Sequence, residues 1–334
     1  MMRNNKVIGI IAGILLVIAG ILYFQQTNST LKPELKDFAV EDTASVSKIF
    51  MVNKLNEQVL LEKRNDQWYV NDKYPARKDA IDMLLKTFKR IDVKAPVSKS
   101  AFNTVVKNLA ANNVKVEVYT NDEKAEKIFY VGGPTQDYYG TYMMLENSST
   151  PFIMHIPGFS GYLSSRFFLN EDEWRDQTIC RNRFEEISSV SITNFRNTGQ
   201  SFHAVNLGNN KFDLIDLAKN QSVASFDTVM LKQYLAQYKK LSFERFATEV
   251  SRERTDSILS TPAIYKIAIE NKINGSTEIL AFLRPSTSED PADREQYPYD
   301  LERMYGKINN DSNLVIIQYF TFDPLFADLK MFLR

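Results

Sequence analysis

Apolar and polar residues recur along the chain with two different periods. Val114, Val116 and Val118 are separated by charged residues, and this period of two predicts a half-buried strand. Apolar residues spaced three and four apart predict amphipathic helices over 81–91 and 231–241. Strands and helices combined in this way indicate a folded α+β protein.

The same order of elements occurs twice. In each copy a pair of strands is followed by a helix, a hairpin, a Tyr-Gly turn, another strand and a closing helical segment. The matching positions, first copy before second, are Val46 and Val190, Trp68 and Phe212, Ile81 and Leu231, Leu84 and Tyr234, Leu85 and Leu235, Phe88 and Tyr238, Ile91 and Leu241, Val114 and Tyr265, Ile128 and Ile279, Pro134 and Pro285, Gly140 and Gly306, and Phe152 and Val315. We therefore expect an internal duplication, each half being an antiparallel sheet covered by helices on one side.

The two copies also differ. An amphipathic helix that contains Phe102 and Leu109 is predicted only in the first copy, and a polar insertion, Ser286–Arg303, only in the second. The predicted organisation is a cytoplasmic tail (1–6), a transmembrane helix (7–24), a linker (25–44), a first α+β repeat (45–182) and a second α+β repeat (183–334).

The segment 7–24 carries no charged residue. As a helix it would span about 27 Å, just enough for a hydrocarbon core of about 30 Å. Arg3 and Lys6 precede it, so the positive-inside bias keeps the N-terminus cytoplasmic and exports the rest. A cleaved signal peptide is the alternative, although the run is longer than a usual signal core and no Ala-x-Ala site follows promptly. We expect a single-pass protein of the bacterial inner membrane with a periplasmic main domain.

The partners of such an anchor are expected to be the lipid bilayer, through residues 7–24, and other envelope proteins. Gly9 and Gly13 form a Gly-x-x-x-Gly pattern, which lets two transmembrane helices approach closely. Such pairs are common in apolar helices, so a helix without this contact is the competing interpretation.

Composition narrows the function classes. Lys and Arg total 41 and Asp and Glu total 41, so the net charge gives no electrostatic case for nucleic-acid binding. Cys180 is the only cysteine, which excludes an intramolecular disulfide and disfavours a metal–thiolate site. We expect no cofactor and no metal.

The sequence contains no established catalytic motif. His155 and His203 have no partner nearby in sequence for a zinc site, and we expect structural roles for both. Gly158–Tyr162 resembles a Gly-x-Ser-x-Gly nucleophile elbow, but Tyr162 replaces the last glycine and Ser160 would need a parallel α/β sheet around it. We therefore expect that the protein is not an enzyme.

Two short segments are candidates for binding. Tyr138, Tyr139 and Tyr142 could form an aromatic lip, although a turn and a strand face also explain them. Trp174 and Arg175 lie at the junction of the copies, where they would latch the halves together or expose an anchor for a partner.

The insertion of the second copy is the third candidate. Its charged residues include Glu289, Asp290, Asp293 and Arg294. Calcium binding by the carboxylates is one interpretation, but the order of residues lacks the alternation of a calcium loop, and a solvated loop is favoured. Because long polar loops on a rigid sheet are common sites of recognition, the insertion remains a candidate for binding a partner.

Several of these motifs resemble an uncharacterised bacterial family. They are Gln67-Trp68-Tyr69-Val70, Tyr74-Pro75-Ala76, Tyr130-Val131-Gly132-Gly133, Gly140-Thr141-Tyr142 and Trp174-Arg175-Asp176. The family is a domain of unknown function of the 4340 type. The resemblance implies an exported single-pass protein, in some members associated with auxiliary components of ABC-type transporters or gliding-motility machines. It implies no catalytic or ligand residues.

The sequence thus favours a non-enzymatic, membrane-anchored accessory or scaffold protein on the extracytoplasmic side. The alternative is an extracytoplasmic module that binds a ligand or peptide in the groove between the two halves. A hydrolase is the least favoured of the three.

Overall fold

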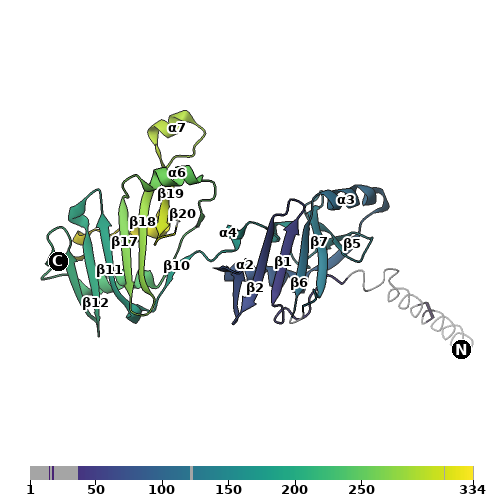
Figure 1. Cartoon of the computed structure of the whole chain (residues 1–334), viewed down its shortest axis with the longest axis horizontal. Coiled ribbons are helices and arrows are strands. Elements are labelled where there is room, and N and C mark those ends of the chain that lie inside the picture. Colours follow the sequence, from purple (N-terminus) through teal and green to yellow (C-terminus); the bar gives the residue numbers. More distant parts are fainter. Residues whose placement is uncertain (1–14, 16, 19–36, 121–122, 312, 334) are drawn as a thin grey trace, which may run out of the picture. The chain divides into compact units, whose positions relative to one another are not determined.

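The computed structural model describes residues 15, 17–18, 37–120, 123–311 and 313–333. The chain divides into two compact units, unit 1 (Met1–Trp174) and unit 2 (Arg175–Arg334) (Figure 1). The predicted repeat boundary at residue 182 therefore differs from the boundary between these units. Strand β10 (Thr178–Arg181), from the segment assigned to the first repeat, pairs in unit 2 with β15 (Lys240–Ser242).

Most of the predicted anchor, with Gly9 and Gly13, lies outside the described residues. Within 7–24 only Leu15, Val17 and Ile18 are described, and they are helical and exposed. In the part of the chain that the structure describes, no helix is long and apolar enough to cross a membrane.

Unit 1 is built on one nine-stranded antiparallel sheet, visible at the right of Figure 1. Its strands, in sheet order, are β4 (Tyr74–Pro75), β3 (Gln67–Val70), β2 (Gln58–Arg64), β1 (Lys48–Asn53), β6 (Val114–Tyr119), β7 (Lys127–Pro134), β8 (Thr141–Leu145), β9 (Phe152–His155) and β5 (Asp92–Pro96). The chain thus forms one half of the sheet, crosses to the far edge at β5, and returns to fill the middle.

Two helices of different character pack on this sheet. The apolar stripe of α2 (Lys78–Arg90) is buried with the inner face of the sheet, and the helix ends with Lys89 and Arg90, which favour its negative C-terminus. Helix α3 (Lys99–Ala111) begins at the cap Ser98, whose hydroxyl accepts a bond from the Ala101 amide. It packs against β7 and β8.

Unit 2 contains a second nine-stranded antiparallel sheet. Its strands, in sheet order, are β14 (Gln221–Ser222), β13 (Lys211–Asp216), β12 (Phe202–Gly208), β11 (Ile187–Asn194), β17 (Tyr265–Asn271), β18 (Gly275–Pro285), β19 (Tyr299–Ile308), β20 (Leu314–Gln318) and β16 (Arg245–Phe246). Its helices are α5 (Thr228–Ala236), α6 (Arg252–Leu259), α7 (Pro291–Gln296) and α8 (Tyr319–Phe322).

The two sheets have the same connectivity, which confirms the predicted duplication. The helix stripe matches at the predicted pair of Leu84 in α2 and Tyr234 in α5, which are both buried. The predicted pair of Leu85 and Leu235 differs in burial, because Leu85 is only partly buried while Leu235 is fully buried.

Strand pairing fixes which residues correspond. Across the first hairpins Ile49 pairs with Leu61 and Leu61 with Val70, and in unit 2 Val190 pairs with Ala204 and Ala204 with Leu214. Trp68 and Phe212 then occupy the same place, as predicted. The predicted match of Val46 with Val190 is wrong, because Ile49 holds that place.

In the central strands too, part of the predicted correspondence between the repeats differs from the structure. The row Val114, Val131, Met143 and Phe152 corresponds to the row Tyr265, Ala281, Gly306 and Val315. The matches of Val114 with Tyr265 and Phe152 with Val315 are confirmed. The predicted match of Gly140 with Gly306 is wrong, because Gly306 corresponds to Met143. The return strands are also shifted by one residue, since Val131 corresponds to Ala281 and not to Phe282.

Both sheets carry helices on two faces, not on one as expected. Ala281 belongs to the main core of unit 2, while the adjacent Phe282 packs with Ile258 of α6 in a separate cluster. Because successive side chains of a strand point to opposite faces, α6 covers the face opposite α5. Helix α6 follows β16 as α3 follows β5, so the first copy has no extra helix.

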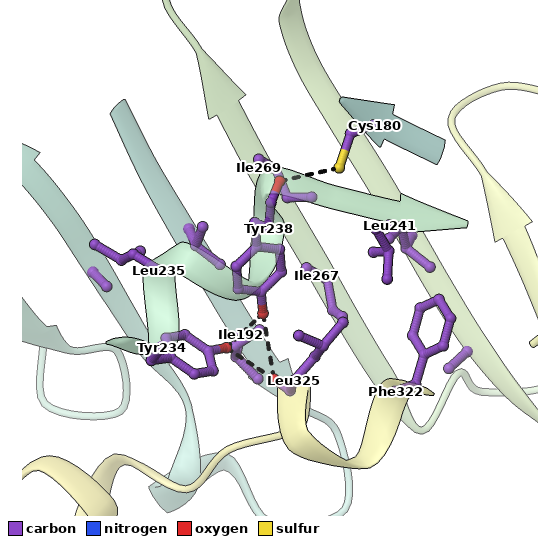
Figure 2. Packing of buried hydrophobic residues seen from close by; sticks show 14 of the residues in the cluster. Cys180, Ile192, Tyr234, Leu235, Tyr238, Leu241, Ile267, Ile269, Phe322 and Leu325 are labelled. Atoms are coloured by element: carbon purple, nitrogen blue, oxygen red, sulfur yellow. Dashed lines mark hydrogen bonds between the residues drawn. The ribbon is translucent and has the colours of Figure 1, made fainter. Parts of the chain in front are cut away.

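A pair of buried tyrosines organises the core of unit 2 (Figure 2). The hydroxyls of Tyr234 and Tyr238 are 2.6 Å apart, and Tyr234 donates to the Leu325 carbonyl at 2.8 Å. Burial raises the pKa of both phenols, so both stay neutral. The Cys180 thiol donates to the Tyr238 carbonyl, and burial raises its pKa to about 11.

The outermost strands of both sheets are short or irregular. β4, β14 and β16 each have two residues, and Pro75 lies in β4. β5 is longer, but it contains a bulge between Val93 and Ala95 and ends at Pro96.

Candidate functional site

A pocket of about 410 Å³ opens at one end of the sheet in unit 2. It lies where β11 ends, beside the C-terminal part of α6 and the end of β18. Its apolar lining includes Phe195, Pro262, Leu283 and Tyr299, and its polar lining includes Arg196 and Arg254, with Ser257 and Thr261. Phe195 is 49% exposed and Tyr299 47% exposed, so two aromatic rings are available at its rim.

Unit 1 has a pocket of about 340 Å³ at the corresponding place. It is lined by the turn after β1, with Lys54 and Leu55, and by the residues that follow α3. The strand rows place Asn53 opposite Val114 and Asn194 opposite Tyr265, so Lys54 and Leu55 correspond to Phe195 and Arg196. The duplication therefore produced two pockets, and the one in unit 2 is larger and more aromatic.

The polar insertion Ser286–Arg303 borders only the unit 2 pocket, through Tyr299. Its helix α7 begins at the cap Asp290, whose carboxylate accepts a bond from the Ala292 amide at 2.9 Å. Figure 1 shows α7 projecting beyond the ends of β18 and β19. Glu289, Asp293 and Arg294 are exposed, as are Tyr297 and Leu301. Among the described residues no group of three or more His, Cys, Asp or Glu side chains could hold a metal ion.

Ion pairs hold the base of the insertion against the sheet. Arg284 of β18 pairs with Asp300 of β19, and both side chains are largely buried. Arg303 contacts Glu244 at 2.8 Å, and Arg245 contacts Glu249 at 2.7 Å. The hydrogen bond from Arg245 lowers the pKa of Glu249, so this carboxylate stays ionised. The insertion is thus fixed to the sheet at its two ends.

The three candidate tyrosines lie in two different environments. The rings of Tyr138 and Tyr162 are 5.9 Å apart, and Tyr138 and Tyr139 are exposed. Tyr142 is partly buried in β8 and lines a different pocket with Lys94. Tyr138 and Tyr139 thus remain available for contact, but the three rings do not form one lip in the described structure.

Trp174 and Arg175 belong to different units. Trp174 is fully buried in unit 1, stacks on Phe168 at 4.1 Å and donates to the Phe168 carbonyl at 2.9 Å. Arg175 is only 7% exposed, and its guanidinium lies over the ring of Phe246 at 3.9 Å in unit 2. The alternative prediction of an exposed anchor at Trp174 is therefore wrong, because its ring is buried in the core of unit 1. The apolar periodicity of the sequence did not reveal this burial.

The remaining sequence candidates lie outside these sites. Ser191 Oγ is 2.5 Å from His203 Nδ1 on the face of the unit 2 sheet opposite α5, and both residues are partly buried. Burial lowers the pKa of His203, while the charges of Asp213 and Glu270 raise it to a smaller extent. His155 lies in β9 opposite Asp92, and Ser160 is exposed in the loop that follows.

Sequence reasoning missed the pocket residues Phe195, Arg196 and Arg254. Each is an ordinary residue of a turn or a polar helix, and only the fold brings them together. The one sequence feature that could have indicated them is their place in the second copy. They lie where this copy differs from the first, and the pocket that they line borders the insertion.

No curated protein and no solved structure matches the chain. A family described as "Domain of unknown function (DUF4340)" matches residues 67–262, a range that reaches from β3 of unit 1 to the end of α6 in unit 2. This range covers more than half of the chain, so the protein belongs to the DUF4340 family of unknown function.

Proposed function

We propose that the protein is a non-enzymatic scaffold that binds another protein of the cell envelope through the pocket and insertion of unit 2. The observation that supports this most is the contrast between the repeats. Both have the same nine-strand order, yet only one has a pocket bordered by a long polar insertion. A feature that one repeat lacks is not needed to build the fold.

The chemistry of the pocket supports recognition of a peptide segment. None of its described lining residues is Asp, Glu, His or Cys, so the pocket offers the Ser257 and Thr261 hydroxyls no carboxylate or imidazole base that could activate them as nucleophiles. Aromatic and Arg side chains, by contrast, are enriched among residues that dominate binding energy.

The positive charge of the pocket indicates which kind of peptide segment would bind there. Within the described part of the chain, neither Arg196 nor Arg254 has a carboxylate at ion-pair distance. A segment with one acidic residue and one aromatic or aliphatic residue would bind both the guanidinium groups and the rings of Phe195 and Tyr299.

The membrane anchor belongs to the same proposal. The uncharged run 7–24, preceded by Arg3 and Lys6, supports a single pass with the two units outside the cytoplasm. The family resemblance supports an ABC-type transport, gliding or secretion machine as the assembly in which the scaffold acts.

A second candidate is a binding module for a small extracytoplasmic ligand or peptide. Its support is the pocket volume of about 410 Å³, which lies within the common range of small-molecule sites, roughly 300–1,000 Å³.

The test places a photo-crosslinking amino acid at Tyr299 or Phe195 of the full chain in native membranes. The matched control places it at Leu55, which lines the corresponding pocket of unit 1. We expect a discrete protein adduct from the unit 2 positions, absent from the Leu55 variant and lost when Arg196 and Arg254 are both changed to Gln.

Two further variants separate scaffold, ligand binding and catalysis. Deletion of residues 288–296, closed with a short Gly-Ser link, should leave the melting temperature nearly unchanged and weaken the adduct. A ligand-binding module would instead yield no protein adduct and a small molecule retained by the purified protein. The scaffold proposal is wrong if the deletion keeps every partner while Ser160→Ala or His155→Ala alone abolishes function in a folded protein.

A further inference from the structure

A separate pocket in unit 1 concentrates positive charge. It has a volume of about 400 Å³ and lies between α2 and the segment 156–166 that follows β9. Its lining is Asp82, Met83, Lys86, Arg90, Ile156, Phe159 and Arg166. Three of these seven side chains are cationic and one is anionic.

The single carboxylate of the pocket already has a partner. Lys78 Nζ, one helical turn before Asp82, lies 3.0 Å from Asp82 Oδ2. Across the described residues, no carboxylate lies within ion-pair distance of Lys86, Arg90 or Arg166. The pocket therefore has an excess of positive charge that the chain itself does not neutralise.

Both arginines are held in place by neutral acceptors. Arg90 Nη2 donates to the Pro157 carbonyl at 3.0 Å, and Arg166 Nη1 donates to Thr87 Oγ1 at 2.8 Å. The Arg166 guanidinium also lies over the ring of Phe159, 4.4 Å from its centre. Each bond uses one of the five N–H groups of a guanidinium, so most donors remain for a ligand.

The two guanidinium groups are close enough to repel each other. The pKa of Arg166 is lowered, first by burial and then by the charge of Arg90. Repulsion between partly buried like charges is relieved when an anion binds between them. An oxyanion with several acceptor oxygens suits two guanidinium forks and one ammonium.

The fold does not require this cluster. The apolar stripes that begin in α2 and α5 match at a constant offset in the sequence, which places Ala236 at the position of Lys86 and Lys240, the first residue of β15, at the position of Arg90. The second repeat places a shorter helix, α5, on a sheet of the same strand order without the full cationic set. As with the insertion of unit 2, a feature present in one copy is free to serve binding.

We propose that the pocket between α2 and residues 156–166 binds a phosphate group through Lys86, Arg90 and Arg166. Phe159 is 40% exposed and Met83 37% exposed at its rim, where they would contact the apolar part of a phosphate ester. The phosphate comes either from a soluble phosphate compound or from a phospholipid headgroup, because both present the same oxyanion.

The test measures thermal unfolding of the full chain in a neutral detergent with increasing sodium phosphate, at an ionic strength held constant with sodium chloride. A parallel series uses a short-chain phosphatidylglycerol below its micelle concentration. The variants are Arg90→Gln and Lys86→Gln. Lys86 makes no hydrogen bond or ion pair within the described residues. We therefore expect Lys86→Gln to fold even if Arg90→Gln does not, and it then tests the proposal alone.

The matched control is Lys89→Gln. Lys89 is exposed on the same helix and does not line the pocket, so the change in net charge is the same. We expect a saturable rise in melting temperature for the wild type and for Lys89→Gln, and at least a tenfold weaker phosphate affinity in the pocket variants.

The two ligand series identify the source of the phosphate. A rise with sodium phosphate equal to that with the lipid assigns the site to soluble phosphate, and a rise that occurs at much lower lipid concentration assigns it to a headgroup. The proposal is overturned if neither ligand raises the melting temperature, or if Lys89→Gln loses the effect as completely as Lys86→Gln.

Discussion

Leu109 of α3 lies directly against Gly132 of β7, and a Cβ atom at Gly132 would be 2.7 Å from Leu109 Cδ2 and 3.1 Å from the Tyr142 carbonyl oxygen. Gly132 thus has a packing role, because the absence of a side chain there allows α3 to approach the sheet. In unit 2 the corresponding place holds Phe282, which packs under α6.

This contact predicts that Gly132→Ala destabilises the protein by about 1–3 kcal/mol, because α3 must move or Leu109 must leave its rotamer. The matched control is Gly133→Ala, since no atom lies within 4 Å of a Cβ there. Denaturant unfolding of both variants measures the difference. Equal loss in the two variants would contradict the packing role of Gly132.

Matched leucines of the two helices are expected to differ in importance. Leu235→Ala should cost about 2–5 kcal/mol, since Leu235 is fully buried among the core residues of unit 2. Leu85→Ala should cost clearly less, because Leu85 is only partly buried. Urea unfolding followed by circular dichroism measures both, and Leu84→Ala, at a fully buried site, serves as the reference within unit 1.

The tyrosine pair predicts a further effect on stability. Tyr234→Phe leaves the Leu325 carbonyl without its closest hydroxyl donor, although Tyr238 lies 3.4 Å away. We expect a loss of about 1–3 kcal/mol, the usual effect of an unsatisfied buried acceptor. Tyr238→Phe should cost less, because Tyr234 would still bond Leu325. A reversed order of the two melting temperatures would contradict this assignment.

His203 is expected to titrate below the usual range of histidine, near 6.5, because burial disfavours its charged form. The unfolded chain then binds a proton at a higher pH than the folded protein does. The stability that His203 contributes is therefore complete above the ordinary pKa and is lost as the pH falls through that value toward the folded pKa.

Imidazole NMR of the full chain measures this pKa, with His155→Gln to assign the remaining resonance. Glu270→Gln should lower the pKa of His203 further, because the Glu270 charge favours the imidazolium. A pKa at or above 6.5 in the wild type would show that the Ser191–His203 contact does not bury the ring.

Local pattern was sufficient to predict the elements that have one apolar side. The stripes of α2 and α5 and the strand of Val114, Val116 and Val118 were identified because polar residues mark the other side. For these elements the predicted match between the two repeats is also correct.

The same reasoning misplaced the return strand of unit 2. Residues Ile279 to Phe282 are all apolar, because α5 and its neighbours cover one face and α6 the other. A strand that is buried on both faces shows no alternation, and its register is then set only by its partners. Helix α6 was missed for a related reason: Ile258 is its only fully buried residue.

The candidate site was harder to predict than the fold. The insertion could be identified as an addition to one repeat, but the pocket beside it joins a turn after β11, the surface of α6 and the end of β18. These segments are far apart in sequence, and their meeting depends on the crossover that sends β16 to the sheet edge before α6 returns.

The outer strands limit how any partner can attach. A peptide that extends a sheet by β-augmentation needs a row of unpaired backbone N–H and C=O groups along a straight edge. Two-residue strands, a bulge and the prolines at 75 and 96 leave no such row on β4, β5, β14 or β16. The same edges protect the sheets against edge-to-edge aggregation at high local concentration, so the described units can be crowded together without joining their sheets.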